Sequence, residues 1–192
     1  IESFDVAGII TDVRSMIGDG VGRLVSRALA ARGLGRGAPD FQQAALARFL
    51  ALYDRCLTAQ TKPYPPVIET LTALRRRGFR MAVCTNKPLE PTRRILAALR
   101  LADFFGAVIG GDSLPTRKPA PEPLLTAISR SGGIPERSAM IGDSANDILC
   151  ARAAGVAGIL IPSDYGPSDS GAATDADLSL PDFGALPAAV SY

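Results

Sequence analysis

Hydrophobic and polar positions alternate in blocks along residues 66–161, and these blocks predict strands and helices in turn. Short apolar runs, which suit buried strands, alternate with stretches whose apolar positions recur every three or four residues. This alternation is typical of a parallel sheet with right-handed crossovers. We predict strands at residues 79–84, 107–110, 138–141 and 156–161, and helices at 67–77, 91–99, 121–131 and 148–154.

A different pattern covers residues 13–60, where two helical stretches are separated by the glycine-rich segment 33–39. Each stretch places its apolar side chains on one face, for example Val25 and Leu29 in the first and Phe49 and Tyr53 in the second. We therefore expect one α/β domain, Rossmann-like with helices on both faces of the sheet, formed by residues 1–12 and 66–192. A small helical module, residues 13–65, is inserted after a first strand that includes Phe4.

The composition of the chain restricts both its possible binding partners and its possible catalytic mechanisms. The chain has 192 residues, 47% of them hydrophobic, and a formal net charge of +2. Nothing in it favours nucleic acid or a membrane as a partner, because no long charge run and no apolar run of about 20 residues occurs. The absence of histidine excludes Ser-His-Asp and Cys-His hydrolases. Three widely spaced cysteines in apolar surroundings suit a reduced, cytoplasmic protein.

The candidate chemistry centres on residues 139–147, where an apolar run ends in Gly-Asp-Ser and a second acid follows. The run predicts a strand that presents Asp143 at its carboxyl end, where open α/β sheets bind ligands. Asp147, in the first turn of the next helix, should face the same crevice. Two neighbouring carboxylates repel each other, and hard oxygen ligands suit Mg²⁺.

Three further pieces should meet Asp143 at this edge of the sheet. They are Asp5 after the first strand, Thr85 with Asn86 after the strand at 79–84, and Lys118. A carboxylate, a hydroxyl, an ammonium and a carboxylate-held cation suit phosphoryl transfer, which depends on positioning and charge neutralisation.

These motifs, in this order and at this spacing, resemble the haloacid dehalogenase (HAD) superfamily of Mg²⁺-dependent phosphatases, and its phosphoglycolate phosphatases in particular. Residues 64–161 carry most of the resemblance, through the segments at 64–67, 82–88, 110–115, 118–121 and 142–147. Residues 15–21 are similar to a part of the helical cap of that subgroup. The glycines at 18, 20 and 22 are best interpreted as a cap hinge or a substrate-facing loop rather than a dinucleotide loop.

The resemblance implies a role for each matched residue. Asp5 would be the nucleophile that forms an aspartyl phosphate, with Lys118 and Thr85 as its catalytic partners. Thr85, Asn86, Lys118 and Gly8 would bind the substrate phosphate. Asp5, the backbone carbonyl of Ala7, Asp143 and Asp147 would hold Mg²⁺.

The first motif departs from the family pattern Asp-x-Asp-x-Thr. Ala7 stands where the family has its second Asp, and Ile9 stands where it has Thr. In the family that second Asp protonates the leaving group and later activates water. A cap helix expected before residue 14 is also missing. Either the protein is a degenerate family member, or the sequence is incomplete and out of register near its start; the intact later motifs and the absent initial Met favour the second.

We therefore expect a Mg²⁺-dependent phosphatase that hydrolyses a small phosphomonoester similar to phosphoglycolate. Its partner would be a small phosphorylated metabolite, and the protein would be a monomer or a homodimer. Two alternatives stay open. One is a catalytically impaired phosphate-binding or regulatory protein of the same fold, and the other is a related phosphatase for pyrophosphate or a sugar phosphate.

Overall fold

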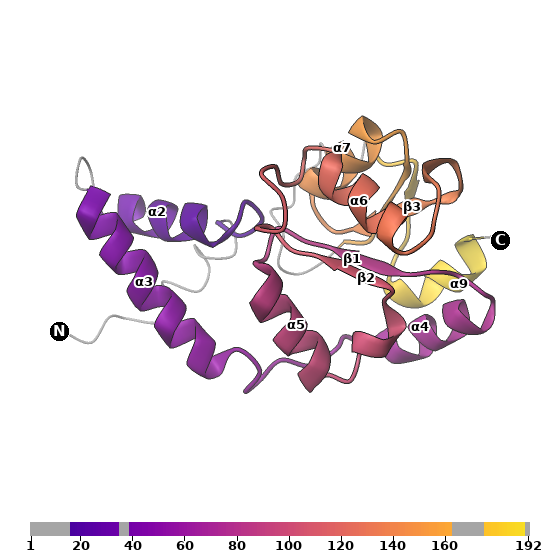
Figure 1. Cartoon of the computed structure of the whole chain (residues 1–192), viewed down its shortest axis with the longest axis horizontal. Helices are drawn as coiled ribbons and strands as arrows, with labels where there is room; N and C mark the ends of the chain where they lie inside the picture. Colours follow the sequence, from indigo (N-terminus) through magenta and orange to yellow (C-terminus); the bar gives the residue numbers. More distant parts are fainter. Residues whose placement is uncertain (1–15, 35–38, 163–174, 191–192) are drawn as a thin grey trace.

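The computed structural model describes residues 16–34, 39–162 and 175–190. The predicted first strand lies outside these ranges, together with Asp5, Ala7 and Gly8. The described residues form a helical pair and an α/β body, which are seen side by side in Figure 1.

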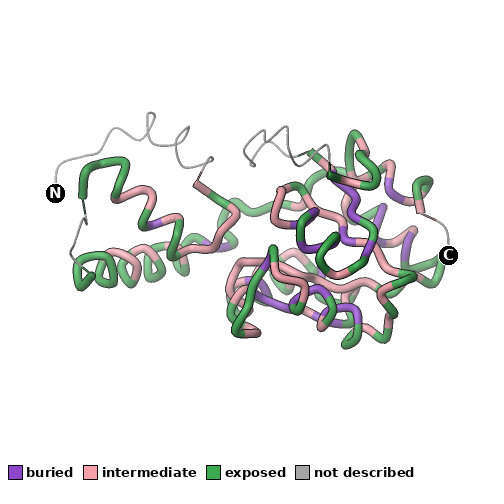
Figure 2. The backbone as a smooth tube through the Cα atoms, turned by 90° about the horizontal axis from the view of Figure 1, so that it is seen from above, coloured by how far each residue is buried: buried purple, intermediate pink, exposed green. Residues whose placement is uncertain are grey.

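The helical pair consists of α2 (Val21–Ala31) and α3 (Pro39–Cys56), which pack against each other. Only Val25 of α2 is buried, and no residue of α3 is. Figure 2 shows the pair as a largely exposed arm beside the more buried α/β body. The prediction of two helices within residues 13–60 is confirmed for the described part. The boundary of the inserted module at residue 13 lies outside it, and the division into two domains stays a prediction.

The described strands form two parallel sheets. In one, β1 (Ala82–Cys84) pairs with β2 (Ala107–Ile109), and Cys84 lies opposite Ile109. In the other, the order is β3 (Ala139–Gly142), β4 (Ala157–Leu160) and β5 (Leu178–Ser179). The parallel pairing predicted from the alternation of strands and helices is confirmed. Strand β1 begins at Ala82, whereas the sequence predicted a start at Phe79, because the ladder with β2 starts only at Ala82 and Phe79 packs instead in a hydrophobic cluster.

Helices cover both faces of these ladders, as predicted (Figure 1). Three short 3-10 turns, η1 (Ala102–Phe104), η2 (Pro135–Arg137) and η3 (Phe183–Ala185), complete the connections. In the part of the chain that the structure describes, no helix is both long and apolar enough to cross a membrane. The helices of the α/β body are α4 (Val67–Arg76), α5 (Leu89–Ala98), α6 (Glu122–Arg130), α7 (Ala145–Ala153) and α9 (Leu186–Ala189).

Strand β3 separates two hydrophobic clusters because its side chains alternate between its faces. Met140 packs on one side with residues of α6 and α7, including Leu124 and Cys150. Ile141 packs on the other side with Leu74 of α4 and Leu186 of α9. The carboxyl end of β3 is thus fixed from both faces, and the loop that follows it starts from a rigid position.

Candidate active site

The loop after β3 is organised by the carboxylate of Asp147. Its Oδ2 accepts hydrogen bonds from the backbone N–H groups of Asp143 and Ser144, both at 3.1 Å, and from the Ser144 hydroxyl at 2.7 Å. Ser144 is the N-cap of α7, so Asp147 satisfies N–H groups that precede the first helical turn. The carboxylate folds back over Gly142, where a Cβ would overlap the Asp147 side chain. Glycine is therefore required at the end of β3.

The other oxygen of Asp147 binds Lys118. The Lys118 ammonium lies 2.5 Å from Asp147 Oδ1 and donates a second hydrogen bond, 2.8 Å long, to the backbone carbonyl of Cys84 at the end of β1. Lys118 is 9% exposed and Asp147 is 4% exposed. Because a buried charge without its partner is costly, each residue depends on the other for its place in this site.

Thr85 and Asn86 follow β1 at the same edge. The N–H of Thr85 extends the ladder to the carbonyl of Ile109, and its hydroxyl oxygen accepts from the N–H of Lys87 at 3.1 Å. The Thr85 hydroxyl therefore keeps its own hydrogen for a ligand. The amide nitrogen of Asn86 donates to the carbonyls of Gly18 and Lys118, at 3.1 and 3.0 Å.

The orientation of the Asn86 amide follows from these two partners. Both are carbonyl oxygens, so the NH₂ group has to face them. Its Oδ1 atom is buried and has no donor among the described residues. In this arrangement the side chain of Asn86 offers no N–H to a phosphate, and it holds the Lys118 loop and the segment at Gly18 together.

Asp143 stands on the loop after β3, and its side chain is exposed. Its oxygens are hard donors of the kind Mg²⁺ prefers, so the residue fits the predicted role of metal ligand. In residues 16–34, 39–162 and 175–190, no three acidic or cysteine side chains gather closely enough to hold a metal ion. The other predicted ligands, Asp5 and the carbonyl of Ala7, lie outside these residues. Both oxygens of Asp147 are already engaged, and its ligation of Mg²⁺ stays a prediction.

The structure thus brings together Thr85, Asn86, Lys118 and Asp147, four of the residues predicted from sequence. Asp143, on the loop after β3, donates its N–H to Asp147 in the first turn of α7. Asn146, which was not predicted from sequence, also takes part: its side chain donates to Asp19 Oδ1 at 2.9 Å. No local pattern could have identified it, because the two residues lie 127 positions apart.

Gly18 and Asp19, which precede α2, connect the helical pair to this site. Asn86, on the loop after β1, and Asn146, in the first turn of α7, both donate to the carbonyl of Gly18. Asp19 is also paired with Arg27 of α2. The hydrogen bond from Asn146 and the nearby Arg27 hold the pKa of Asp19 below its usual value, against the smaller opposing effect of burial on the same group. The interpretation of the glycines at 18–22 as a segment that faces the site is consistent with these contacts.

The thiols of Cys84 and Cys150 lie close to the site, and neither is suited to attack a substrate. Burial raises the pKa of the Cys84 thiol, and it raises that of Cys150 to about 11. Cys150 Sγ donates to the carbonyl of Ala120 at 3.1 Å. Because only the thiolate is nucleophilic, both side chains serve as packing groups.

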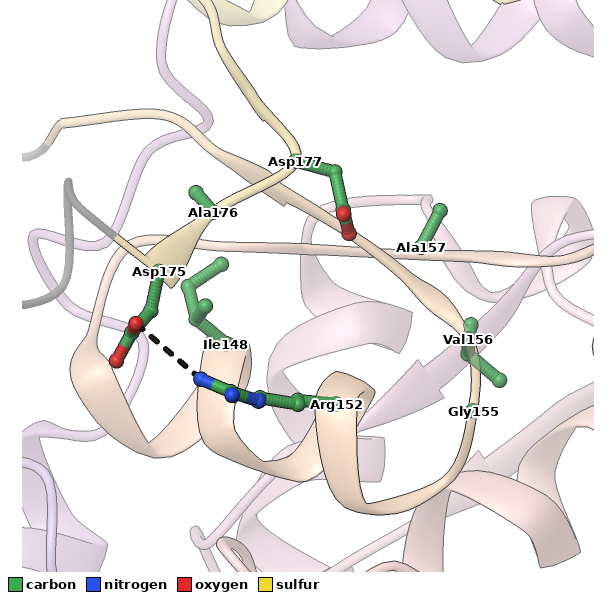
Figure 3. Close-up of a pocket in the computed structure, with 8 residues that line it drawn as sticks. All are labelled: Ile148, Arg152, Gly155, Val156, Ala157, Asp175, Ala176 and Asp177. Atoms are coloured by element: carbon green, nitrogen blue, oxygen red, sulfur yellow. Dashed lines mark hydrogen bonds and ion pairs between the residues drawn. The ribbon is translucent and has the colours of Figure 1, made fainter.

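A cavity of about 520 Å³ lies elsewhere, between α7 and the segment that leads into β5. Figure 3 shows Arg152 and Asp175 facing each other across it, with their charged atoms 3.3 Å apart. Ile148, Val156 and Asp177 also line it. None of the lining residues belongs to the predicted phosphate site, so this cavity does not define the active centre.

Comparison with known proteins identifies the family of this chain. Residues 3–155 match the model of the haloacid dehalogenase-like hydrolase family. A phosphoglycolate phosphatase of Rhodospirillum rubrum is 46% identical over 156 residues, which cover 80% of this chain and 65% of the relative. One from Nitrosospira multiformis is 38% identical over 169 residues, which cover 88% and 74%.

Among solved structures, a predicted phosphoglycolate phosphatase from Haemophilus somnus has a TM-score of 0.85 and 31% sequence identity to this chain. The match covers 93% of this chain and 81% of that one. The chain spans 65% and 64% of the lengths of its relatives from R. rubrum and Nitrosococcus oceani. These proteins are therefore longer than the chain described here.

Proposed function

Because the chain belongs to the haloacid dehalogenase-like hydrolases, we propose that it hydrolyses a small phosphomonoester, with phosphoglycolate as the expected substrate. The substrate comes from the names of its relatives. The observation that carries the proposal is the Lys118 ammonium, buried against Asp147 and against the carbonyl of Cys84, the residue that directly precedes Thr85.

Lys118 and Thr85 supply the groups that a phosphate needs. Lys118 has three N–H groups and uses two of them on Cys84 and Asp147, so the third is left for a phosphate oxygen. Thr85 donates its hydroxyl hydrogen to a second oxygen. Asp147 keeps the ammonium in place before the substrate arrives, and preorganised donors of this kind stabilise the charge that develops in phosphoryl transfer.

Asp5 is the proposed nucleophile. Its carboxylate oxygen attacks phosphorus while the bond from phosphorus to the ester oxygen breaks, so the product alcohol leaves after gaining a proton from water. Water then hydrolyses the aspartyl phosphate, which releases inorganic phosphate and restores the carboxylate. Ala7 cannot give or take a proton, so both steps lack the acid–base help that a second Asp supplies.

Asp143 would hold Mg²⁺ together with Asp5 and the carbonyl of Ala7. When bound, the cation offsets the repulsion between the attacking carboxylate and the phosphate. For Asp147 the contacts favour a positioning role over direct ligation, since its oxygens bind Lys118 and the loop N–H groups.

The test is the Mg²⁺ dependence of phosphate release from phosphoglycolate and from 4-nitrophenyl phosphate. Asp143→Asn should raise the Mg²⁺ concentration needed for half-maximal activity by at least about tenfold, because one carboxylate ligand is lost. Asp103→Asn is the matched control, since Asp103 is an exposed acid in η1, away from the site. Equal Mg²⁺ titrations for the two variants would remove Asp143 as a ligand.

A second candidate function is phosphate binding without efficient turnover, and the presence of Ala7 favours it. In that case the protein would bind inorganic phosphate in calorimetry, and Lys118→Gln would abolish binding, while no ester is hydrolysed. Pyrophosphate and a sugar phosphate belong in the same substrate panel. Faster turnover of either one than of phosphoglycolate would reassign the substrate.

A further inference from the structure

The helical pair contacts the site through residues 18–20, which we call the cap loop. Gly18 accepts from Asn86 and Asn146, and Asp19 accepts from Asn146. The loop after β1 and the first turn of α7 therefore both bind the cap loop, and any substrate at Lys118 lies close to it.

The guanidinium of Arg117 also lies next to the cap loop, at Gly20. A Cβ built on Gly20 would lie 2.9 Å from Arg117 Nη1, so the guanidinium lies against the cap loop in the space that a side chain at position 20 would take. Gly20 has a φ of +90°, which favours glycine on its own account. Arg117 also directly precedes Lys118 in the chain. Two consecutive cations are thus directed differently, with Lys118 facing the α/β body and Arg117 facing the cap loop.

Two other cations at or near this contact have partners: Arg27 pairs with Asp19, and Lys87 donates to the hydroxyl of Tyr53. Arg23 also acts on Asp19 electrostatically, from α2 rather than from the α/β body. No carboxylate in the described ranges forms an ion pair with Arg117, and its side chain is exposed. Its planar fork of N–H donors matches the geometry of a carboxylate.

We infer that Arg117 binds a second anionic group of the substrate, a carboxylate, while Lys118 binds the phosphate. The inference rests on the proposed function and narrows its substrate class to small phosphomonoesters that carry a carboxylate. Arg117 is then a specificity-determining residue. It selects an acidic phosphate ester over a neutral one of the same size, because only the acidic ester provides an acceptor for the guanidinium.

The test compares phosphoglycolate with 2-hydroxyethyl phosphate, a neutral-tailed ester of the same size. We expect Arg117→Gln to lower the ratio of the two kcat/KM values by at least about tenfold, and Arg117→Lys to restore part of it. Arg130→Gln, which changes an exposed arginine in the last turn of α6, should leave the ratio as in the wild type. A ratio that Arg117→Gln leaves within twofold of the wild type would overturn the inference, whether or not both rates fall.

Calorimetric binding of the same two esters separates this inference from the proposed function. If the wild type hydrolyses neither ester, the proposed function fails, and binding still tests Arg117. The inference then predicts tighter binding of phosphoglycolate by the wild type and loss of that preference in Arg117→Gln. Equal binding of the two esters by the wild type would overturn it.

Discussion

The ammonium of Lys118 lies 2.5 Å from the Oδ1 atom of Asp147, and the same ammonium binds the carbonyl of Cys84. Asp147 lies in the first turn of α7, which follows β3, and Cys84 is the last residue of β1. The pair therefore joins the carboxyl ends of β1 and β3, which belong to the two described sheets, at the position where a phosphate would bind. The stability of the fold and the proposed phosphate binding therefore both depend on the side chains of Lys118 and Asp147.

Asp147→Asn should strongly destabilise the fold, because it leaves the Lys118 ammonium buried without a compensating charge. The free energy of unfolding, measured by urea denaturation, should fall by about 3–5 kcal/mol. Asp175→Asn is the matched control, since it breaks the exposed pair with Arg152 and should cost less than about 1 kcal/mol. Similar losses in the free energy of unfolding for the two variants would show that the buried Lys118–Asp147 pair contributes no more to stability than an exposed pair.

Gly142→Ala should disrupt the loop after β3 without changing any charge. The added methyl group overlaps the Asp147 side chain, which then has to leave Lys118 or the loop N–H groups. We expect a loss of about 1–3 kcal/mol in the free energy of unfolding and a parallel loss of activity. Gly22→Ala meets open space on the exposed side of α2 and should instead stabilise by about 0.5–1 kcal/mol. A neutral effect of Gly142→Ala would contradict the fold-back of Asp147.

The Cys150 thiol should make stability fall at high pH. Its pKa in the folded protein is about 11, above the 9.0 of an ordinary thiol, because burial disfavours the thiolate. Between these two values the unfolded chain releases the proton and the folded chain keeps it, so rising pH favours unfolding. Urea denaturation at a series of pH values should show a smaller decline for Cys150→Ala than for the wild type. Parallel curves would mean that Cys150 titrates normally.

Ala7→Asp should raise the rate of ester hydrolysis, because it restores the acid–base group that the family pattern has at this position. The gain should reach about 10²–10⁴ for alkyl phosphates. It should be smaller for 4-nitrophenyl phosphate, whose leaving group hardly needs a proton. Initial rates on the two substrates measure this difference. If neither rate rises, the impaired phosphate-binding alternative gains support.

The sequence was sufficient for most of the α/β body because its signals are local. Apolar runs predicted β1 to β4, and the period of the helical stretches predicted α4 to α7. They did not predict β5, a two-residue strand that pairs with β4. Nor did they predict α9, a four-residue helix that contains Pro187 and whose Leu186 is nonetheless 2% exposed. Packing against Leu74 stabilises that turn, and this contact spans more than a hundred residues of chain.

In the candidate site, too, the sequence predicted features that depend on neighbouring residues but not contacts between distant segments. The sequence pattern correctly placed Asp143 just after a strand and Asp147 in the first turn of the next helix. It could not reveal that Asp147 turns back over Gly142 to bind the loop N–H groups and Lys118, since that depends on the fit of three separate segments. The contacts of the cap loop with Asn86 and Asn146 were hidden for the same reason.

The most direct test of the account is phosphate release by a double variant, Lys118→Gln with Asp147→Asn. The variant removes both charges together and leaves polar side chains of similar size, so neither partner is left as a buried unpaired ion. With Mg²⁺ and phosphoglycolate, the wild type should release phosphate. The variant, folded by circular dichroism, should have a kcat at least about 10²-fold lower. A folded variant with the kcat of the wild type, or a wild type that releases no phosphate from any monoester, would contradict the account.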